Sequence, residues 1–276
     1  MPKNTKIRLD ILLTERGLAE SRSQAQRLVM AGQVRVAGQV ADKPSDPVME
    51  NAEITVENGP RFVSRGGEKL EGALQAFGLQ NLDGQICADL GASTGGFTDC
   101  LLQHGAVKVY AVDVGYGVLH WKLRNDARVV VMERVNARNL TGFPEPIQFA
   151  TIDASFISLK ILLPVVASWW LQSTGQVVAL IKPQFEAGRE EVARGDGVVR
   201  DPEVHRKVLN SVLDFAQQQG FTVRGLVRSS LLGPKGNTEF LVWLEYPGNG
   251  VDVAADLIEN ALLSPLPDGK RTEGHE

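Results

Sequence analysis

The sequence predicts an α/β protein in which a small α+β domain precedes a mostly parallel, seven-stranded sheet covered by helices. Two observations lead to this prediction. From about residue 68 onward, short apolar strands alternate with helical segments, which is typical of a parallel sheet. Before that region, the dipeptide Gly59-Pro60 separates off a shorter, basic segment with its own helix and strand signals.

The length of 276 residues fits two domains better than one. We expect an N-terminal domain over residues 1–60, a linker over 61–68, a larger domain over 69–250 and a C-terminal tail over 251–276. The region from about Pro247 is acidic and rich in proline and glycine, which predicts a loose helix followed by a disordered tail.

The N-terminal domain should contain two helices followed by two short strands. An apolar face marks the first helix, which Gly17 ends, and Ser21 is a favourable N-cap for the second, which Gly32 ends. The residues behind these assignments are Leu9, Leu12 and Leu13 for the first helix, about Ser21–Ala31 for the second, and Val34–Val36 and Ile54–Val56 for the strands.

The second helix sorts its side chains into a polar and an apolar face. Residues 1–44 carry eight basic and four acidic side chains, although the whole chain has a net charge of -4. An arginine-rich face with an apolar back suits binding to phosphates, and a solvated helix face is the open alternative. The polar face holds Arg22, Ser23, Gln26 and Arg27, opposite Ala25, Leu28 and Val29.

The larger domain opens with a helix near Glu68–Phe77, after which strands and helices alternate. The expected strands are Ile86–Leu90, Lys108–Val112, Arg128–Met132, Phe149–Ile152, Val177–Ile181, Phe221–Arg228 and Glu239–Tyr246. The expected helices between them are Phe97–His104, Leu119–Arg124, Ser158–Trp170 and Pro202–Gln219.

The strongest chemical signal is the segment Asp89-Leu90-Gly91-Ala92-Ser93-Thr94-Gly95-Gly96-Phe97, which ends the first of these strands and begins a helix. Glycines at such a turn allow the backbone to approach a ligand closely. Asp113 ends the next strand, where a carboxylate suits the two hydroxyls of a ribose. Neither a G-x-G-x-x-G fingerprint nor a phosphate-binding P-loop is present, so a nucleoside without phosphates, such as S-adenosylmethionine, fits best.

Four charged residues lie where apolar strands begin or end, or before the first strand. Asp153 and Lys182 follow two strands whose carboxyl ends should meet, Glu239 opens the last strand, and Lys69 precedes the sheet. Two lysines and two acids balance to zero, which favours a closed cluster because buried charges need partners.

These motifs resemble known families. The larger domain is similar to the FtsJ-type ribose 2′-O-methyltransferases, a Rossmann-like fold that uses S-adenosylmethionine, with a Lys-Asp-Lys-Glu tetrad matching Lys69, Asp153, Lys182 and Glu239. The segments Ser21–Leu28 and Gly32–Val36 resemble the S4 RNA-binding domain. The combination resembles the TlyA family, whose members are called hemolysin A but methylate ribosomal RNA. Thr94 replaces the proline usual in FtsJ enzymes, as in the TlyA branch.

The resemblance implies methylation of a ribose 2′-hydroxyl, of cytidine as in the TlyA family, on ribosomal RNA or ribosomal subunits. Lys182 would orient or deprotonate the attacking hydroxyl, and both roles remain open. The expected cofactor contacts are Asp89, Gly91, Ala92, Ser93, Gly95, Gly96, Phe97, Asp113, Val114 and Asp153. The expected RNA contacts are Arg8, Arg22, Ser23, Gln26, Arg27, Lys43 and Arg65.

Other function classes find little support in the sequence. Two cysteines and four dispersed histidines predict neither a disulfide framework nor a metal site. No signal-peptide pattern opens the chain and no apolar run is long enough to span a bilayer, so we expect a cytoplasmic protein and no membrane partner. A non-catalytic RNA-binding or ribosome-assembly protein is the alternative to an enzyme, and a pore-forming hemolysin is the weakest reading.

Overall fold

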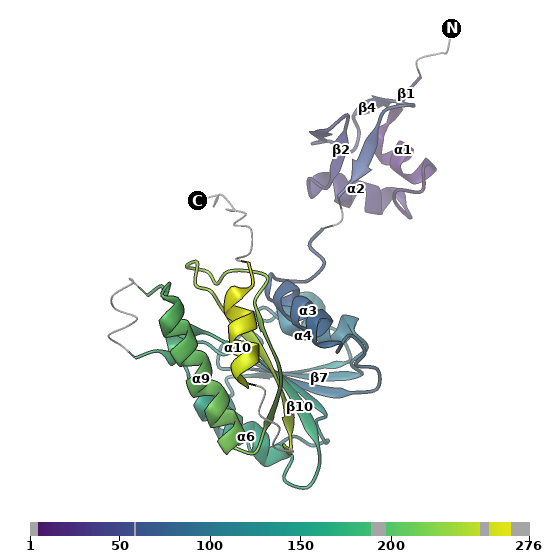
Figure 1. The fold of residues 1–276 in the computed structure, drawn as a ribbon. Coiled ribbons are helices and arrows are strands. Elements are labelled where there is room, and N and C mark those ends of the chain that lie inside the picture. Colours follow the sequence, from purple (N-terminus) through teal and green to yellow (C-terminus); the bar gives the residue numbers. More distant parts are fainter. Residues whose placement is uncertain (1–4, 58, 189–196, 249–253, 266–276) are drawn as a thin grey trace. The chain divides into compact units, whose positions relative to one another are not determined.

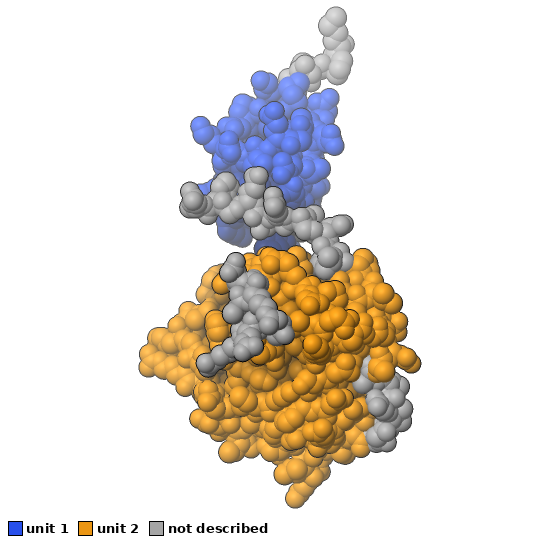
Figure 2. Space-filling view, turned by 60° about the vertical axis from the view of Figure 1, so that its left-hand side comes forward, with its two compact units in different colours: residues 1–61 blue, residues 62–276 orange. Residues whose placement is uncertain are grey.

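A computed structural model describes residues 5–57, 59–188, 197–248 and 254–265. The chain forms two compact units, residues 1–61 (unit 1) and 62–276 (unit 2), which Figure 2 colours blue and orange. Phe62 is buried within unit 2, and the first helix of that unit begins at Gly66, so residues 62–68 take part in its fold.

Unit 1 contains the two expected helices, α1 (Leu9–Glu15) and α2 (Arg22–Met30). The Ser21 side chain caps α2 by accepting a hydrogen bond from the backbone N–H of Gln24. Because Ala25 and Val29 on one side of α2 are buried with leucines of α1, the helices enclose a small core of their own.

Unit 1 has more strands than the sequence predicted. The two predicted strands are confirmed, and three further pairing segments are too short to produce an alternating pattern in the sequence. One antiparallel sheet has the order β3-β2-β5, and β1 pairs with β4. The strands are β1 (Lys6–Arg8), β2 (Val34–Val36), β3 (Gln39–Val40), β4 (Pro47–Met49) and β5 (Ile54–Val56).

Unit 2 is built on a seven-stranded sheet with the order β11-β12-β10-β9-β6-β7-β8, which confirms the predicted fold class. The neighbouring strands β10, β9, β6, β7 and β8 run parallel to one another, whereas β12 is antiparallel to both of its neighbours, β10 and β11. Their bounds are β6 (Ile86–Leu90), β7 (Lys108–Asp113), β8 (Val129–Glu133), β9 (Phe149–Ile152), β10 (Gly175–Ile181), β11 (Thr222–Arg228) and β12 (Phe240–Tyr246).

Helices cover both faces of this sheet (Figure 1). One core joins the sheet to α6, α9 and α10, and the other joins it to α3, α4 and α5. The helices and short turns are α3 (Gly66–Phe77), α4 (Gly96–Gln103), α5 (Trp121–Arg124), η1 (Ala137–Asn139), α6 (Leu159–Trp169), α7 (Pro183–Glu186), α9 (Pro202–Gln218) and α10 (Ala254–Leu263).

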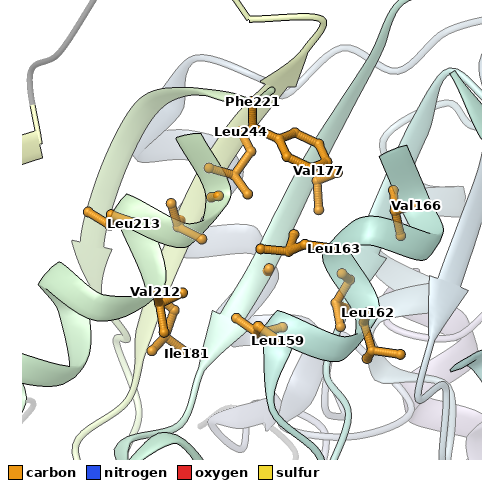
Figure 3. Close-up of a cluster of buried hydrophobic side chains, with 14 of the residues drawn as sticks. Leu159, Leu162, Leu163, Val166, Val177, Ile181, Val212, Leu213, Phe221 and Leu244 are labelled. Carbon is orange, nitrogen blue, oxygen red and sulfur yellow. The ribbon is translucent and has the colours of Figure 1, made fainter. Parts of the chain in front are cut away.

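Strand β10 shows why the two cores form. Its side chains alternate between the faces, so that Val177, Ala179 and Ile181 enter the first core while Val178 and Leu180 enter the second. All five are almost completely buried, which explains the uninterrupted apolar run in the sequence. Figure 3 shows the first core, where leucines of α6 pack between β10 and α9.

The strand order reverses between β6 and β9, since the chain passes outward from β6 to β8 before it returns to β9. In open parallel sheets, ligands bind at the carboxyl ends of the strands beside such a reversal. The predicted helix after Pro247 is present as α10, and the remaining predicted tail lies largely outside the described residues.

Candidate active site

A cavity of about 950 Å³ opens in unit 2 at the carboxyl ends of the central strands. Its wall combines the start of α3, the glycine turn after β6, the segments after β9 and β10, and the loop before β12. Segments far apart in the sequence therefore meet at one place, as the positions of the charged residues predicted.

The four charged residues of the predicted tetrad all line this cavity and form two ion pairs. Lys69 Nζ donates to Glu239 Oε2 at 2.6 Å, and Lys182 Nζ lies 2.6 Å from Asp153 Oδ1. Lys69, Lys182 and Glu239 are buried, and the Asp153 side chain is 23% exposed. The opposite charges pair within the site, which offsets the cost of removing them from water.

Two polar side chains extend these pairs and were not predicted from the sequence. Lys182 Nζ also donates to Ser155 Oγ at 3.0 Å, and Gln184 Nε2 donates to Glu239 Oε1 at 3.3 Å. A protonated lysine has three N–H groups, so the hydrogen bond to Ser155 leaves donors for another acceptor. The ion pair with Asp153 and this hydrogen bond thus hold Lys182 in place while it can still bond a ligand.

The glycine turn brings the backbone of β6 against the segment after β9. Gly91 has φ +88°, and a Cβ atom at this position would lie 2.6 Å from the carbonyl oxygen of Asp153. Gly95, with φ +97°, also adopts a left-handed conformation that other residues rarely adopt. Glycine is therefore required here both for the backbone conformation and for the close approach.

Asp89 is fully buried beneath this turn rather than in the cavity wall. Its carboxylate accepts hydrogen bonds from Thr98 Oγ1 at 2.7 Å and from Thr151 Oγ1 at 2.9 Å. Burial raises the pKa of Asp89 to about 6, against the two threonine hydrogen bonds, which act to lower it. The side chain ties α4 and β9 together, and a direct cofactor contact stays a prediction.

Asp113 is positioned by backbone donors at the end of β7. Its Oδ2 accepts from the Ser93 N–H at 2.8 Å and its Oδ1 accepts from the Gly115 N–H at 2.7 Å. Each carboxylate oxygen can accept a second hydrogen bond. Asp113 is not part of the cavity wall itself, but Ser93, to which it is bonded, is.

The remaining predicted cofactor contacts divide into two groups. Those that line the cavity are Gly91, Ala92, Ser93, Gly96, Phe97 and Asp153. Those that the structure places outside its wall are Asp89, Gly95, Asp113 and Val114, of which Val114 is 68% exposed.

An exposed aromatic side chain stands at the cavity and has no counterpart in the prediction. Phe156 is 90% exposed, lines the cavity and adopts a left-handed conformation with φ 62°. Its ring packs against Phe185 with centroids 5.0 Å apart, and the Lys182 ammonium lies 5.7 Å from the Phe185 ring centroid. A bulky residue in this conformation is unusual and often marks a functional site.

The predicted RNA-binding residues of unit 1 lie on its surface, several of them around one carboxylate. Arg8, Arg22 and Gln26 all donate to Asp10, a residue absent from the prediction. Arg27 donates to Ser23 at 3.1 Å. Lys43 is exposed, whereas Arg65 belongs to unit 2, lines the cavity and donates to the Leu232 carbonyl at 3.3 Å.

Within the described residues, one group of three metal-type ligands comes together, comprising Glu71, Cys100 and His104. Both ring nitrogens of His104 already have protein partners, the carbonyl of Gln80 and the Glu71 carboxylate. The group is therefore a hydrogen-bonded contact between α3 and α4. Among all the residues that the structure describes, no helix is both long enough and apolar enough to cross a membrane.

Comparison with known proteins identifies both units. The FtsJ-like methyltransferase family matches residues 62–246, and the S4 domain family matches residues 7–54. The chain belongs to the FtsJ-like methyltransferase family. This assignment and the N-terminal S4 domain confirm the resemblances drawn from the sequence.

Relatives match this chain over nearly its whole length. The 16S/23S rRNA (cytidine-2′-O)-methyltransferase TlyA of Mycobacterium tuberculosis is 46% identical over 96% of this chain and 98% of its own length. A Streptococcus thermophilus structure named provisionally as a hemolysin is 47% identical, covers 94% of this chain and 96% of that one, and gives a TM-score of 0.66.

A distant structure supports the fold alone. It is a Listeria monocytogenes protein classed provisionally as an S-adenosylmethionine-dependent methyltransferase, with 14% identity and a TM-score of 0.51. The match covers 66% of this chain and 97% of that one. The sheet of unit 2 thus has the fold of that class of enzymes.

Proposed function

We propose that this FtsJ-like protein transfers a methyl group from S-adenosylmethionine to the 2′-hydroxyl of a cytidine in ribosomal RNA. The observation that carries the proposal is the meeting of two paired lysines and a glycine turn in one cavity. The printed function of the Mycobacterium tuberculosis relative, which matches nearly the whole chain, supports the same substrate.

The residues around the glycine turn fit a nucleoside without phosphates. Gly91 and Gly96 let the backbone of the turn pack closely against the segment after β9 and the start of α3, and both line the cavity. Asp113 retains acceptor capacity for ribose hydroxyls. S-adenosylmethionine, when bound, would supply an activated methyl group on sulfur with a good leaving group. The protein then has to position the attacking oxygen and to accept or hold its proton.

Lys182 is placed to act on that oxygen. Asp153 and Ser155 fix the ammonium group by an ion pair and a hydrogen bond, and a further N–H can bond the ribose 2′-oxygen. Lys69 and Glu239 form the second pair, so that the cavity offers the 2′-hydroxyl a fixed and charge-balanced surrounding.

Phe156 supports a nucleotide as the substrate. Proteins that bind single-stranded or displaced nucleotides commonly stack the base on an aromatic side chain. The exposed ring of Phe156 stands beside Phe185 and Lys182 at the cavity. A base stacked on Phe156 would therefore bring its ribose toward the Lys182 ammonium.

The S4 domain supports RNA, and by the relatives' printed functions ribosomal RNA, as the partner. Phosphate contacts from its exposed arginines would supply affinity without sequence information, while the cavity selects the nucleotide. A ribosomal substrate would place the reaction in the cytoplasm. Which subunit is methylated is part of the test.

The experiment is methyl transfer from tritiated S-adenosylmethionine to purified 30S and 50S subunits and to their RNA. A 2′-O-methyl group blocks alkaline cleavage of the adjoining phosphodiester bond, so the label should appear in alkali-resistant dinucleotides. Label recovered only in mononucleotides would indicate a methylated base and overturn the proposed position. No transfer to any substrate would favour a non-catalytic RNA-binding protein.

A further inference from the structure

Asp10 is the buried charge at the centre of the basic surface of unit 1. It lies in the first turn of α1, and its side chain is 0% exposed. The Arg8 guanidinium beside it, with further hydrogen bonds from Gln26 and Arg22, holds the pKa of this carboxyl well below its usual range, so the group is ionised. A buried carboxylate costs free energy unless its acceptors are satisfied.

The two oxygens of Asp10 are satisfied by three of the predicted RNA-binding side chains. Oδ1 accepts from Arg8 Nε at 3.1 Å, while Oδ2 accepts from Arg8 Nη2 at 3.0 Å and from Arg22 Nε and Gln26 Nε2, each at 2.9 Å. One carboxylate thus joins the end of β1, the start of α1 and the polar face of α2.

The contacts with Asp10 leave the outer edges of both arginines available. The Arg8 side chain is 42% exposed and the Arg22 side chain is 54% exposed. Arg22 bonds to Asp10 through Nε, and no partner for its two Nη groups is found among the described residues. Paired Nη donors in a rigid plane match the geometry of a phosphate.

We propose that Asp10 is a positioning residue that holds Arg8, Arg22 and Gln26 in the arrangement that binds an RNA phosphodiester, which rests on the proposed RNA substrate. A free arginine loses considerable side-chain entropy when it becomes ordered on a ligand. Asp10 fixes two arginines before RNA arrives, so less of that cost falls on binding. In RNA affinity, the gain from holding the arginines in place is larger than the loss caused by the negative charge of Asp10.

The proposal predicts a result opposite in sign to simple electrostatics. Asp10→Asn removes one negative charge, so a surface that acted by charge alone would bind RNA more tightly. The NH2 group of the asparagine would face N–H donors of Arg8, Arg22 or Gln26, with which it cannot form hydrogen bonds. Those side chains would therefore lose their fixed positions. We expect the affinity of the full-length protein for 23S ribosomal RNA to fall about tenfold in a filter-binding or fluorescence assay at fixed salt.

Asp42→Asn is the matched control, because Asp42 is an exposed acid of unit 1 that lies outside the Asp10 cluster. It removes the same charge and should leave RNA affinity equal to wild type or slightly higher. Binding of Asp10→Asn as tight as that of Asp42→Asn would overturn the proposal, as would a failure of the wild-type protein to bind this RNA.

Arg22→Lys provides a second test that does not depend on a buried substitution. Lysine keeps the charge, but its single ammonium group cannot bond Asp10 and present a planar pair of donors outward at the same time. RNA affinity should fall several-fold, and unchanged affinity would count against the proposal even if Asp10→Asn fails to fold. Wild-type RNA binding without 2′-O-methylation would refute the proposed function while leaving the role of Asp10 intact.

Discussion

Lys182 is held by its ion pair with Asp153 and its hydrogen bond to Ser155, outside the glycine turn, so its role can be tested separately from cofactor binding. We expect Lys182→Ala to lower methyl transfer at least 100-fold, since a positioned acid–base group typically contributes ~10²–10⁴-fold. S-adenosylmethionine affinity, measured by calorimetry, should stay within a few fold of wild type because the glycine turn is untouched. Lys207→Ala, at an exposed lysine of α9, is the control, and a tenth or more of wild-type activity in Lys182→Ala would contradict the assignment.

A change at Asp113 should weaken cofactor binding before it affects the chemical step, the opposite of what we expect at Lys182. Asp113→Ala removes the acceptors expected to bond the cofactor ribose, and it also releases the Ser93 and Gly115 N–H groups that shape the turn. Cofactor affinity should therefore fall first, and saturating S-adenosylmethionine should restore much of the rate. Calorimetry that finds unchanged affinity would refute the placement of the cofactor ribose at Asp113.

Asp89 predicts a pH dependence of stability. Its pKa is raised to about 6 in the folded protein, against about 3.8 for an ordinary aspartate. Between these values the folded state keeps a proton that the unfolded state loses, so the free energy of unfolding falls as pH rises from about 4 to about 6, by up to ~3 kcal/mol. Asp89→Asn removes this titration while its amide can still bond Thr98 and Thr151. Denaturant unfolding at several pH values should give a flatter curve for the variant, and parallel curves would show that burial does not shift this group.

At the scale of elements, the contact between the starts of α3 and α4 depends on glycine. A Cβ atom on Gly96 would lie 2.7 Å from the backbone nitrogen of Gly67, which leaves no room for a side chain. Gly96→Ala should push the helices apart, lower stability by about 1–3 kcal/mol and weaken cofactor binding. Gly72→Ala, in the middle of α3, meets only ordinary contacts and should instead stabilise the protein by about 0.5–1 kcal/mol. Thermal melts of both variants decide the matter, and equal shifts would exclude a special contact at Gly96.

The elements also show how far the sequence alone could lead. The strands of unit 2 were predictable because burial on both faces makes them continuously apolar. Asp153 and Lys182 were predictable because polar residues begin where such strands end, whereas Lys69 and Glu239 joined them in a tetrad through the family resemblance. The three-residue strand β1 carries too little pattern to be recognised. Asp10 and Ser155 could not be found, since Arg22 and Gln26 are brought to Asp10, and Lys182 to Ser155, only by tertiary structure. The left-handed conformation of Phe156 could not be predicted either, because such a backbone conformation is expected from sequence mainly at glycine.

For the whole molecule, the separate cores of the two units suggest that binding and chemistry can be divided. Unit 1 buries its own cluster around Leu9, Leu13 and Val29, and no residue of that cluster belongs to the two cores of unit 2. Every member of the tetrad and of the glycine turn lies in unit 2. A fragment consisting of residues 61–276 should therefore fold and bind S-adenosylmethionine as the full chain does.

What this fragment lacks is the surface formed by Arg8, Arg22, Gln26 and Arg27. Because phosphate contacts release counterions, its affinity for ribosomal RNA should be lower and should depend less steeply on salt concentration. Methylation should then fall through a higher KM for RNA, with kcat changed less. Binding titrations at several salt concentrations, combined with cofactor calorimetry on both proteins, make the comparison. A fragment with the affinity and salt dependence of the full chain would move the RNA anchor to residues that the fragment keeps, namely Arg61, Arg65 and the segment 186–200, much of which lies outside the described residues.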